Sequence, residues 1–197
     1  MKLLLPVGSL ILLLFFTISC KKDSGSKSAL DGNWTFTSTT QTTSSTVLLD
    51  YGGGDIEKQM TTSTLSSTNN KGTISIGGGI LTAKGVSYTL SGTMDYVDYI
   101  NNIPQDPISS PISIPIPTFN SAATFKLIGS DSIYYPNGGF SSLGGGAQSN
   151  AAGGRYTLAG NTLTMVMKVD TSFSTTSQGI PVQKHDVATQ TVVLTRQ

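Results

Sequence analysis

Few residues in this chain could perform acid–base or nucleophilic chemistry, and their spacing does not favour catalysis. His185 is the only histidine, and Asp186 beside it would point to the opposite face of a strand, so it could not orient the ring. The chain has no Gly-x-Ser-x-Gly elbow, phosphate loop or His-Glu-x-x-His motif, and no cluster of the four ligands that zinc needs. A glycosidase-like carboxylate pair stays open, although most acids lie in expected turns or beside lysines. We therefore expect no enzyme, no cofactor and no metal site.

The single cysteine, Cys20, lies in surroundings that do indicate a chemical role. Lys2 is followed by a mostly apolar run from Leu3 to Phe16, and the small Ser19 directly precedes the cysteine. A run of that length is too short for a membrane-spanning helix, which needs ~20 residues. It suits the apolar part of a secretory signal. An ordinary signal peptide that is cut nearby and leaves a free thiol is the alternative.

The end of this segment resembles the lipobox of bacterial lipoproteins, with Thr17 where that family usually has Leu, Val or Ile. The resemblance implies a cleaved signal helix at 1–19 and a Cys20 that carries acyl chains such as palmitate and becomes the N-terminus. Residues 20–29 would be a flexible tether and 30–197 one β domain. Lys21 stands where some lipoproteins carry an inner-membrane retention aspartate. The resemblance therefore favours the outer membrane of a Gram-negative bacterium, on either face.

The composition excludes several classes of partner. Removal of Lys2 with the signal leaves eleven basic and eleven acidic residues, a neutral balance that argues against nucleic acid and against a polybasic membrane surface. One cysteine cannot form a disulfide within the chain, so packing and a hydrogen-bonded sheet must stabilise it. Only 12% of the residues are charged, and hydroxyl side chains carry most of the polarity.

The pattern after the signal predicts antiparallel β-structure, because short runs alternate apolar and polar residues between turn residues. The longest run is 87–96, and the clearest hairpin is Tyr156–Met165, with Ala159-Gly160-Asn161 as its connection. We also expect turns at 69–72 and 77–79. The proline-rich segment 103–117 must be a loop, a polyproline-like strip or an edge strand, and the segment 136–154 a long mobile loop.

Two groups of residues could contact a ligand or partner. The patch 95–102 contains Tyr96 and Tyr99, which could hold a sugar or, with Asp95 and Asp98, a calcium ion; a strand running into a loop is the plainer interpretation. Isoleucines among the prolines could form an apolar lid or docking surface, or they could cover one end of the core. Methionines and tyrosines on alternating faces could line an apolar cavity or simply fill the core. The residues concerned are Tyr88, Met94, Ile108, Ile112, Ile114, Ile116, Met165 and Met167.

Both ends of the mature chain carry motifs of one known superfamily. Leu30-Asp31-Gly32-Asn33-Trp34 opens the first expected strand, the hairpin Tyr156–Leu163 comes late, and Val192–Arg196 closes the chain. Together they resemble lipocalins, and more closely the lipocalin-like lipoproteins of Gram-negative bacteria. The resemblance implies a lipocalin-like barrel or half-open barrel in which Gly32 and Trp34 form the opening motif and Arg196 lies across the tryptophan ring.

The functions that follow from these patterns are binding functions. The first expectation is a lipid-anchored envelope protein that holds a small apolar ligand in its barrel, with membrane lipid contacted through Cys20. The alternative is a non-catalytic structural or surface lipoprotein with a filled barrel, whose loops contact a protein or a glycan. A continuous apolar cavity of ~300 Å³ or more would favour the first. A filled interior with an exposed Ile or Tyr patch would favour the second.

Overall fold

The computed structural model describes residues 28–137 and 151–197, and every regular element in them is a β-strand. The predicted signal helix, the acylated Cys20 and residues 20–27 of the predicted tether lie outside the described residues. Ser28 and Ala29 already belong to the fold, because the Asp31 amide donates to the Ser28 carbonyl and the Arg196 guanidinium donates to the Ala29 carbonyl. The strands are β1 (Gly32–Gly52), β2 (Asp55–Gly77), β3 (Ile80–Ile100), β4 (Ile103–Pro104), β5 (Ile108–Thr124), β6 (Lys126–Ile128), β7 (Ser132–Tyr135), β8 (Ala152–Ala159), β9 (Thr162–Ser177) and β10 (Ile180–Arg196).

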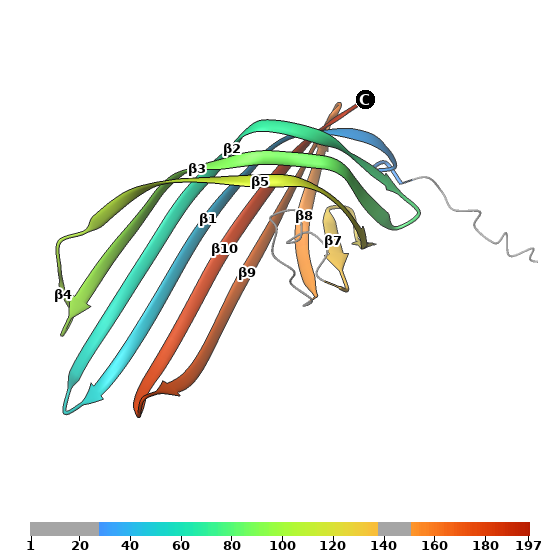
Figure 1. Ribbon diagram of the computed structural model, residues 1–197. Coiled ribbons are helices and arrows are strands. Elements are labelled where there is room, and N and C mark those ends of the chain that lie inside the picture. The colour runs from blue at the N-terminus through green and yellow to red at the C-terminus, as the bar shows by residue number, and fades with distance from the viewer. Residues whose placement is uncertain (1–27, 138–150) are drawn as a thin grey trace, which may run out of the picture.

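All ten strands form one antiparallel sheet, so the predicted all-β antiparallel class is confirmed. The order is β4-β3-β2-β1-β10-β9-β8-β7-β6, with β5 also paired to β3 (Figure 1). The sheet does not close into a barrel, since no ladder joins its two edges. Only Phe125 separates β5 from β6, and its amide donates to the Gly79 carbonyl over 2.7 Å. The chain thus crosses from one edge of the sheet to the other at a single residue.

Tight turns made of residues with positive φ connect the long strands. Gly78 and Gly79 join β2 to β3, Asn101 and Asn102 join β3 to β4, and Gln178 and Gly179 join β9 to β10. Such two-residue connections match the twist of the flanking strands when φ is positive, which glycine and asparagine tolerate best. The turn predicted at 77–79 is confirmed. The predicted late hairpin is also confirmed, but its loop is only Gly160-Asn161, because Ala159 pairs with Thr162.

Three local expectations change in the structure. Residues 69–72 are not a turn: β2 runs through them with a bulge, at which Asn69 and Gly72 take φ of 55° and 105°. The proline-rich segment is the edge strand β5, which was one of its three interpretations. Part of the expected loop 136–154 is strand, because β8 begins at Ala152; residues 138–150 lie outside the described part.

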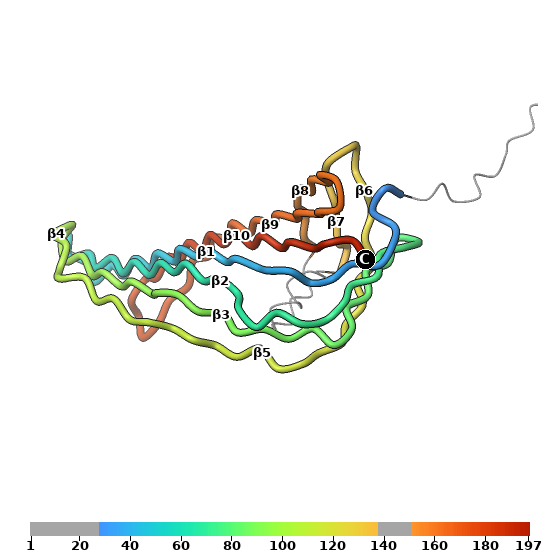
Figure 2. The backbone as a smooth tube through the Cα atoms, turned by 90° about the horizontal axis from the view of Figure 1, so that it is seen from above, coloured from blue at the N-terminus to red at the C-terminus, as the bar shows by residue number. Residues whose placement is uncertain are grey.

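The strands are much longer than the usual five or six residues. β1, β2 and β3 contain 21, 23 and 21 residues, which corresponds to about 70 Å each. One end of this sheet curls around a core (Figure 2). We call this end, which holds Trp34, the proximal region, and the flat continuation the distal sheet. The distal sheet comprises residues 40–64, 92–113 and 168–190, in which no residue is buried, and it carries the tips of three hairpins (Figure 1).

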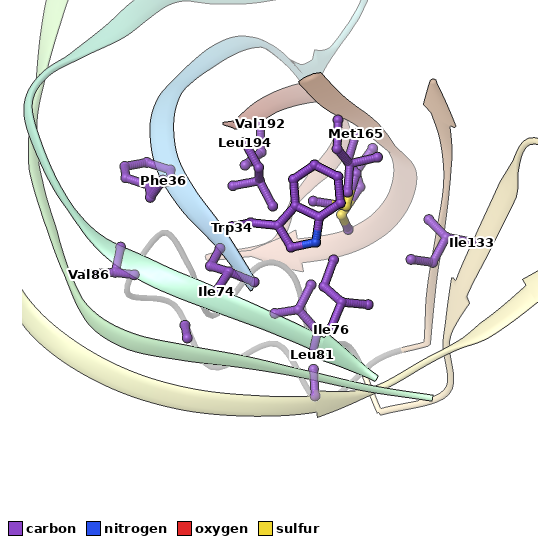
Figure 3. Close-up of a cluster of buried hydrophobic side chains, with 14 of the residues drawn as sticks. Trp34, Phe36, Ile74, Ile76, Leu81, Val86, Ile133, Met165, Val192 and Leu194 are labelled. Atoms are coloured by element: carbon purple, nitrogen blue, oxygen red, sulfur yellow. The ribbon is translucent and has the colours of Figure 1, made fainter. Parts of the chain in front are cut away.

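The core lies entirely in the proximal region, where the sheet curls and side chains from opposite parts of it meet (Figure 2). Trp34 is completely buried, with Ile76, Met165 and Leu194 around it (Figure 3). Phe36 packs against Tyr88 with ring centroids 5.2 Å apart, and Phe125 packs against Tyr135 at 6.3 Å. Close packing of this kind gives the proximal region most of the buried apolar surface of the protein.

Candidate functional site

The contact between Trp34 and Arg196 that the sequence led us to expect is present. The two residues are direct partners in the β1–β10 ladder, and the guanidinium carbon lies 4.6 Å from the centre of the indole ring. The indole nitrogen donates to the Leu30 carbonyl over 3.0 Å, and Arg196 donates to the Ala29 carbonyl. The contact depends only on the pairing of the first and last strands. It therefore exists although the sheet is not closed.

Gly32 lies beside Arg196 and has a φ of +146°, which residues with a side chain rarely adopt. A Cβ atom added there would lie 3.7 Å from a terminal guanidinium nitrogen of Arg196, at an ordinary contact distance. Leu30 is buried as well, so the opening motif packs as a unit around the tryptophan. The role of these residues is structural: they hold the first strand, the last strand and the end of the tether together.

Buried side chains from several strands pack against one another inside the curled region. Tyr88, Met165 and Met167, which the sequence offered as lining of a cavity, are all buried in the core. Burial raises the pKa of the Tyr88 hydroxyl to about 12 and that of Tyr135 further, because the phenolate form would be desolvated. The Tyr135 hydroxyl donates to the Met165 sulfur over 3.9 Å. These side chains are packing residues of the proximal region.

The remaining candidate residues lie along β3 and β5. Side chains alternate between the faces of a strand, so Met94, Tyr96, Ile112 and Ile114 share the face that continues from the core, which we call the inner face. Register supports this, since Leu90 pairs with Ile114 and Gly92 with Ile112. Tyr99 points to the outer face, where the Lys58 ammonium lies 4.1 Å from the centre of its ring.

Along the inner face of β3 and β5, the side chains become more exposed with distance from the core. Ile112 and Ile116 are half-buried against the core, as expected if they cover its end. Ile108 and Ile114 do not cover it: their exposed fractions are 60% and 43%. The interpretation that all four isoleucines belong to the core is therefore wrong for these two. The cause is the length of β5, which continues past the core into the distal sheet.

Several large apolar side chains are exposed near the tips of the distal hairpins, a feature that the sequence analysis missed. We call this group the distal rim, and its six members lie near the distal ends of β1, β2, β3, β4, β5 and β9. Ile103 has the largest exposed fraction, 65%, and Phe173 has 52%. The group comprises Tyr51, Ile56, Ile100, Ile103, Ile108 and Phe173. The turn motifs Asn101-Asn102 and Gln178-Gly179 were the sequence cues that could have revealed it.

The distal sheet carries two close pairs of ionisable side chains. The Lys184 ammonium lies 2.8 Å from the Asp186 carboxylate, and a ring nitrogen of His185 lies 2.8 Å from Asp170. Hydrogen bonds from Lys184 and Ser45 hold the pKa of Asp186 below its usual value. The predicted separation of His185 from Asp186 is confirmed by these different partners. Both side chains of the pair of His185 and Asp170 are exposed.

The tyrosines of the patch 95–102 also have carboxylate or ammonium partners. The Tyr96 hydroxyl donates to Asp98 over 2.5 Å, and this bond, with smaller contributions from desolvation and nearby acids, raises the pKa of Tyr96 to about 12. Asp98 is thus engaged by a phenol, and Asp95 points to the outer face. Among residues 28–137 and 151–197, no group of three or more His, Cys, Asp or Glu side chains is arranged to hold a metal ion.

The largest cavity for which the lining is described lies outside the curled core. It is a cleft of about 630 Å³ over β7, β8 and β9. Val166 and Lys168 line it, and they alternate with the buried Met165 and Met167, so the cleft is on the outer face. Arg155 also lines it and forms an ion pair with Asp131 at 3.2 Å. Gly154 allows β8 and β9 to approach closely beneath the cleft, because a Cβ atom there would lie 2.6 Å from the Val166 carbonyl oxygen.

Two smaller hollows flank the distal hairpins. One of about 250 Å³ lies beside Leu48 and Ile56, and one of about 130 Å³ lies beside Phe173 and His185. Neither is large enough to enclose a drug-sized molecule, for which pockets of about 300–1,000 Å³ are usual. In the described part of the chain, no helix is long and apolar enough to cross a membrane. Comparison with known proteins adds no assignment: no family model, no curated protein and no solved structure matches this chain.

Proposed function

We propose that this chain is a non-catalytic, lipid-anchored interaction protein of the bacterial envelope, which uses its distal rim to bind a protein partner. The observation that carries the proposal is the position of the exposed apolar residues. Six large apolar side chains are exposed near the hairpin tips at the end of the sheet farthest from the core, where they contribute little to packing. Exposed apolar groups concentrated in one region of a protein are typical of interaction sites.

The nature of the rim supports a protein as the partner. Four of its six members are isoleucines, which have no flat ring against which a sugar could stack. Two polar contacts lie near it: the Tyr51 hydroxyl donates to Glu57 over 3.0 Å, and Lys184 is paired with Asp186. Small-ligand binding inside the curled region has less support, because Tyr88, Met165 and Met167, which the sequence offered as cavity lining, pack in the core.

A site-specific photo-cross-linker tests the rim directly in cells. Placed at Ile103, it should attach the full-length protein to one discrete protein partner. Ile80 offers a matched control, because it is also an exposed isoleucine (46%) at a hairpin end, but at the proximal end of the sheet. We expect no such adduct from Ile80, and loss of the Ile103 adduct when Ile100 is changed to Ser. Equal adducts from both positions would contradict the proposal.

The anchor is tested separately by Cys20→Ser. Three acyl chains, each adding ~0.8 kcal/mol per buried methylene, would hold the wild-type protein permanently in the membrane. The variant should therefore appear in the soluble fraction after cell disruption. Unchanged membrane fractionation would refute acylation at Cys20. Native mass spectrometry of the purified protein should find no lipid bound inside the domain; a bound apolar molecule would instead support the ligand-binding alternative.

A further inference from the structure

Among the described residues, no strand pairs with the outer side of two long edges of the distal sheet, and these edges differ in their capacity to bind another strand. One edge is β5, which pairs with β3 on one side only. The other is the second half of β9, Lys168–Ser177, because the ladder between β8 and β9 begins at Gly154 and Met167. A free edge presents unpaired N–H and C=O groups and is a template for β-pairing, so natural proteins usually protect it.

The β5 edge is protected by prolines. In the ladder with β3, Pro111 pairs with Thr93 and Pro115 with Thr89. Because proline has no N–H, these positions cannot donate to β3, and their nitrogens face away from the sheet. The outward nitrogens therefore belong to five alternate residues, which are Ser109, Pro111, Ser113, Pro115 and Pro117. Three of these residues are prolines, which cannot donate a hydrogen bond to an added strand.

The β9 edge has no such protection. Ser177 and Ile180 close a two-residue turn, so the odd-numbered residues of β9 bond to β10 and the even-numbered ones face outward. The pair Ala159 and Thr162 at the other end of β9 gives the same assignment. Each of the five outward residues keeps its N–H group and is exposed. They are Lys168, Asp170, Ser172, Ser174 and Thr176.

We infer that Lys168–Ser177 pairs with the same segment of a second copy of this chain, in antiparallel orientation about a two-fold axis at Ser172. The first argument for a second copy as the partner is the short length of β8, which leaves Lys168–Ser177 without a paired strand. In that register residue 167 of one copy meets residue 177 of the other, so each hairpin tip reaches the end of the other copy's β8. The free segment and the space beside it thus have the same length, as a two-fold interface requires.

Hydrogen bonding and charge are also self-complementary in this register. Five outward residues on each chain form five bonded pairs, or about ten inter-chain hydrogen bonds, which is the number in a typical protein interface. Lys168 would face Thr176 of the other copy, and Asp170 would face Ser174, so no like charges are opposed. The dimer would contain one continuous antiparallel sheet with the curled regions at opposite ends. The rim residues of β1 to β5 would stay exposed, whereas Phe173 would lie at the new strand pairing.

Proline substitution on the two edges tests this inference. Ser172→Pro removes an outward N–H without touching the β10 ladder, and two-fold symmetry doubles the loss to two hydrogen bonds. We expect the dimer dissociation constant of the full-length protein in detergent, measured by analytical ultracentrifugation, to rise by about tenfold or more. Ser113→Pro is the matched control: it makes the same change on the already blocked β5 edge and should leave the constant unchanged.

Cross-linking gives a readout that does not need the proline variant to fold. In a Cys20→Ser background, Ser172→Cys should form covalent dimers with a short bismaleimide, and Ser113→Cys should not. A wild-type protein that stays monomeric up to roughly 100 μM would overturn the inference. So would a dimer that Ser172→Pro leaves intact, or one lost equally with Ser113→Pro. A monomer in which the chain preceding β8 protects the β9 edge would also overturn it, and hydrogen exchange of Lys168–Ser177 would reveal that case.

Discussion

The proximal region and the distal sheet are built from the same strands, yet different forces stabilise them. In the proximal region the sheet curls, and its inner side chains are buried against one another. In the distal sheet the strands continue as a single layer, so both faces meet solvent and no residue is buried beyond Leu65. Cross-strand pairs such as Thr43 and Ser63, whose hydroxyls are 2.7 Å apart, must provide its stability together with the ladder.

The comparison indicates a division of labour between the two regions. Burial stabilises by roughly 25 cal/mol per Å² of apolar surface, so a sheet covered on one side gains far more than a bare one. Burial in the proximal region therefore provides most of the free energy of folding. This stability allows the distal sheet to stay folded although its surface is exposed. Substitutions should be costly in the first region and almost silent in the second, which makes the comparison testable.

The largest effect is expected at Trp34. Trp34→Ala should lower the free energy of unfolding by ~3–5 kcal/mol, because it removes a fully buried aromatic ring and leaves a cavity. Urea unfolding followed by circular dichroism would measure the loss. Phe173→Ala, the matched change in the distal sheet, should alter stability by less than ~0.5 kcal/mol. Equal losses at the two positions would contradict the division between the regions.

The next effect is expected where the distal sheet joins the core. A Cβ atom on Gly92 would lie 1.9 Å from the Thr64 carbonyl oxygen, so Gly92→Ala must displace backbone between β2 and β3. We expect a loss of ~2–3 kcal/mol, at the upper end of overpacking costs. Gly77→Ala is the control, since nothing lies within 4 Å of its Cβ position. Near-neutral behaviour of both variants would show that the two regions are not rigidly joined at Gly92.

A smaller effect is expected at Arg196. Its contact with the indole should contribute ~0.5–2 kcal/mol as a cation–π interaction, and Arg196→Ala should cost about that much. The losses from Trp34→Ala and Arg196→Ala should not add, because the two residues share one contact. A double-mutant cycle by urea unfolding would show the coupling. Fully additive losses would mean that the arginine acts only through its bond to the Ala29 carbonyl.

The smallest effect concerns the charges of the distal sheet. The folded-state pKa of Asp186 is lowered by Lys184 and Ser45, so its ionised form favours the folded state above the unfolded pKa of about 3.9. This contribution should disappear as the pH falls from about 4 through the lower folded-state pKa, and solvent screening should keep it within ~1 kcal/mol. The free energy of unfolding of Asp186→Asn, measured between pH 2 and 6, should lack this pH-dependent loss. If the variant and the wild type show the same dependence on pH, Asp186 does not contribute to stability in this way.

Local patterns in the sequence determined the strand class and several turns, whereas the pairing of the two chain ends was predicted from the resemblance of their motifs to lipocalin-like proteins. Alternation of apolar and polar residues, Gly78-Gly79 and the Gly160-Asn161 hairpin are local features, and the structure contains each of them. Asn69 and Gly72 were misjudged as a turn because a bulge requires the same positive φ angles. Local conformation alone does not tell whether the chain reverses or continues.

Only the tertiary structure decided how far the strands extend and whether the sheet closes. Ile112 and Ile114 lie two residues apart on one strand and have the same side chain, yet the first packs against the core and the second is exposed. Their sequence neighbours are equally rich in serine and proline. What differs is their distance from the curl of the sheet, which depends on contacts between residues more than a hundred positions apart, such as Trp34 and Arg196. Burial is a property of those distant contacts, and the local sequence does not contain it.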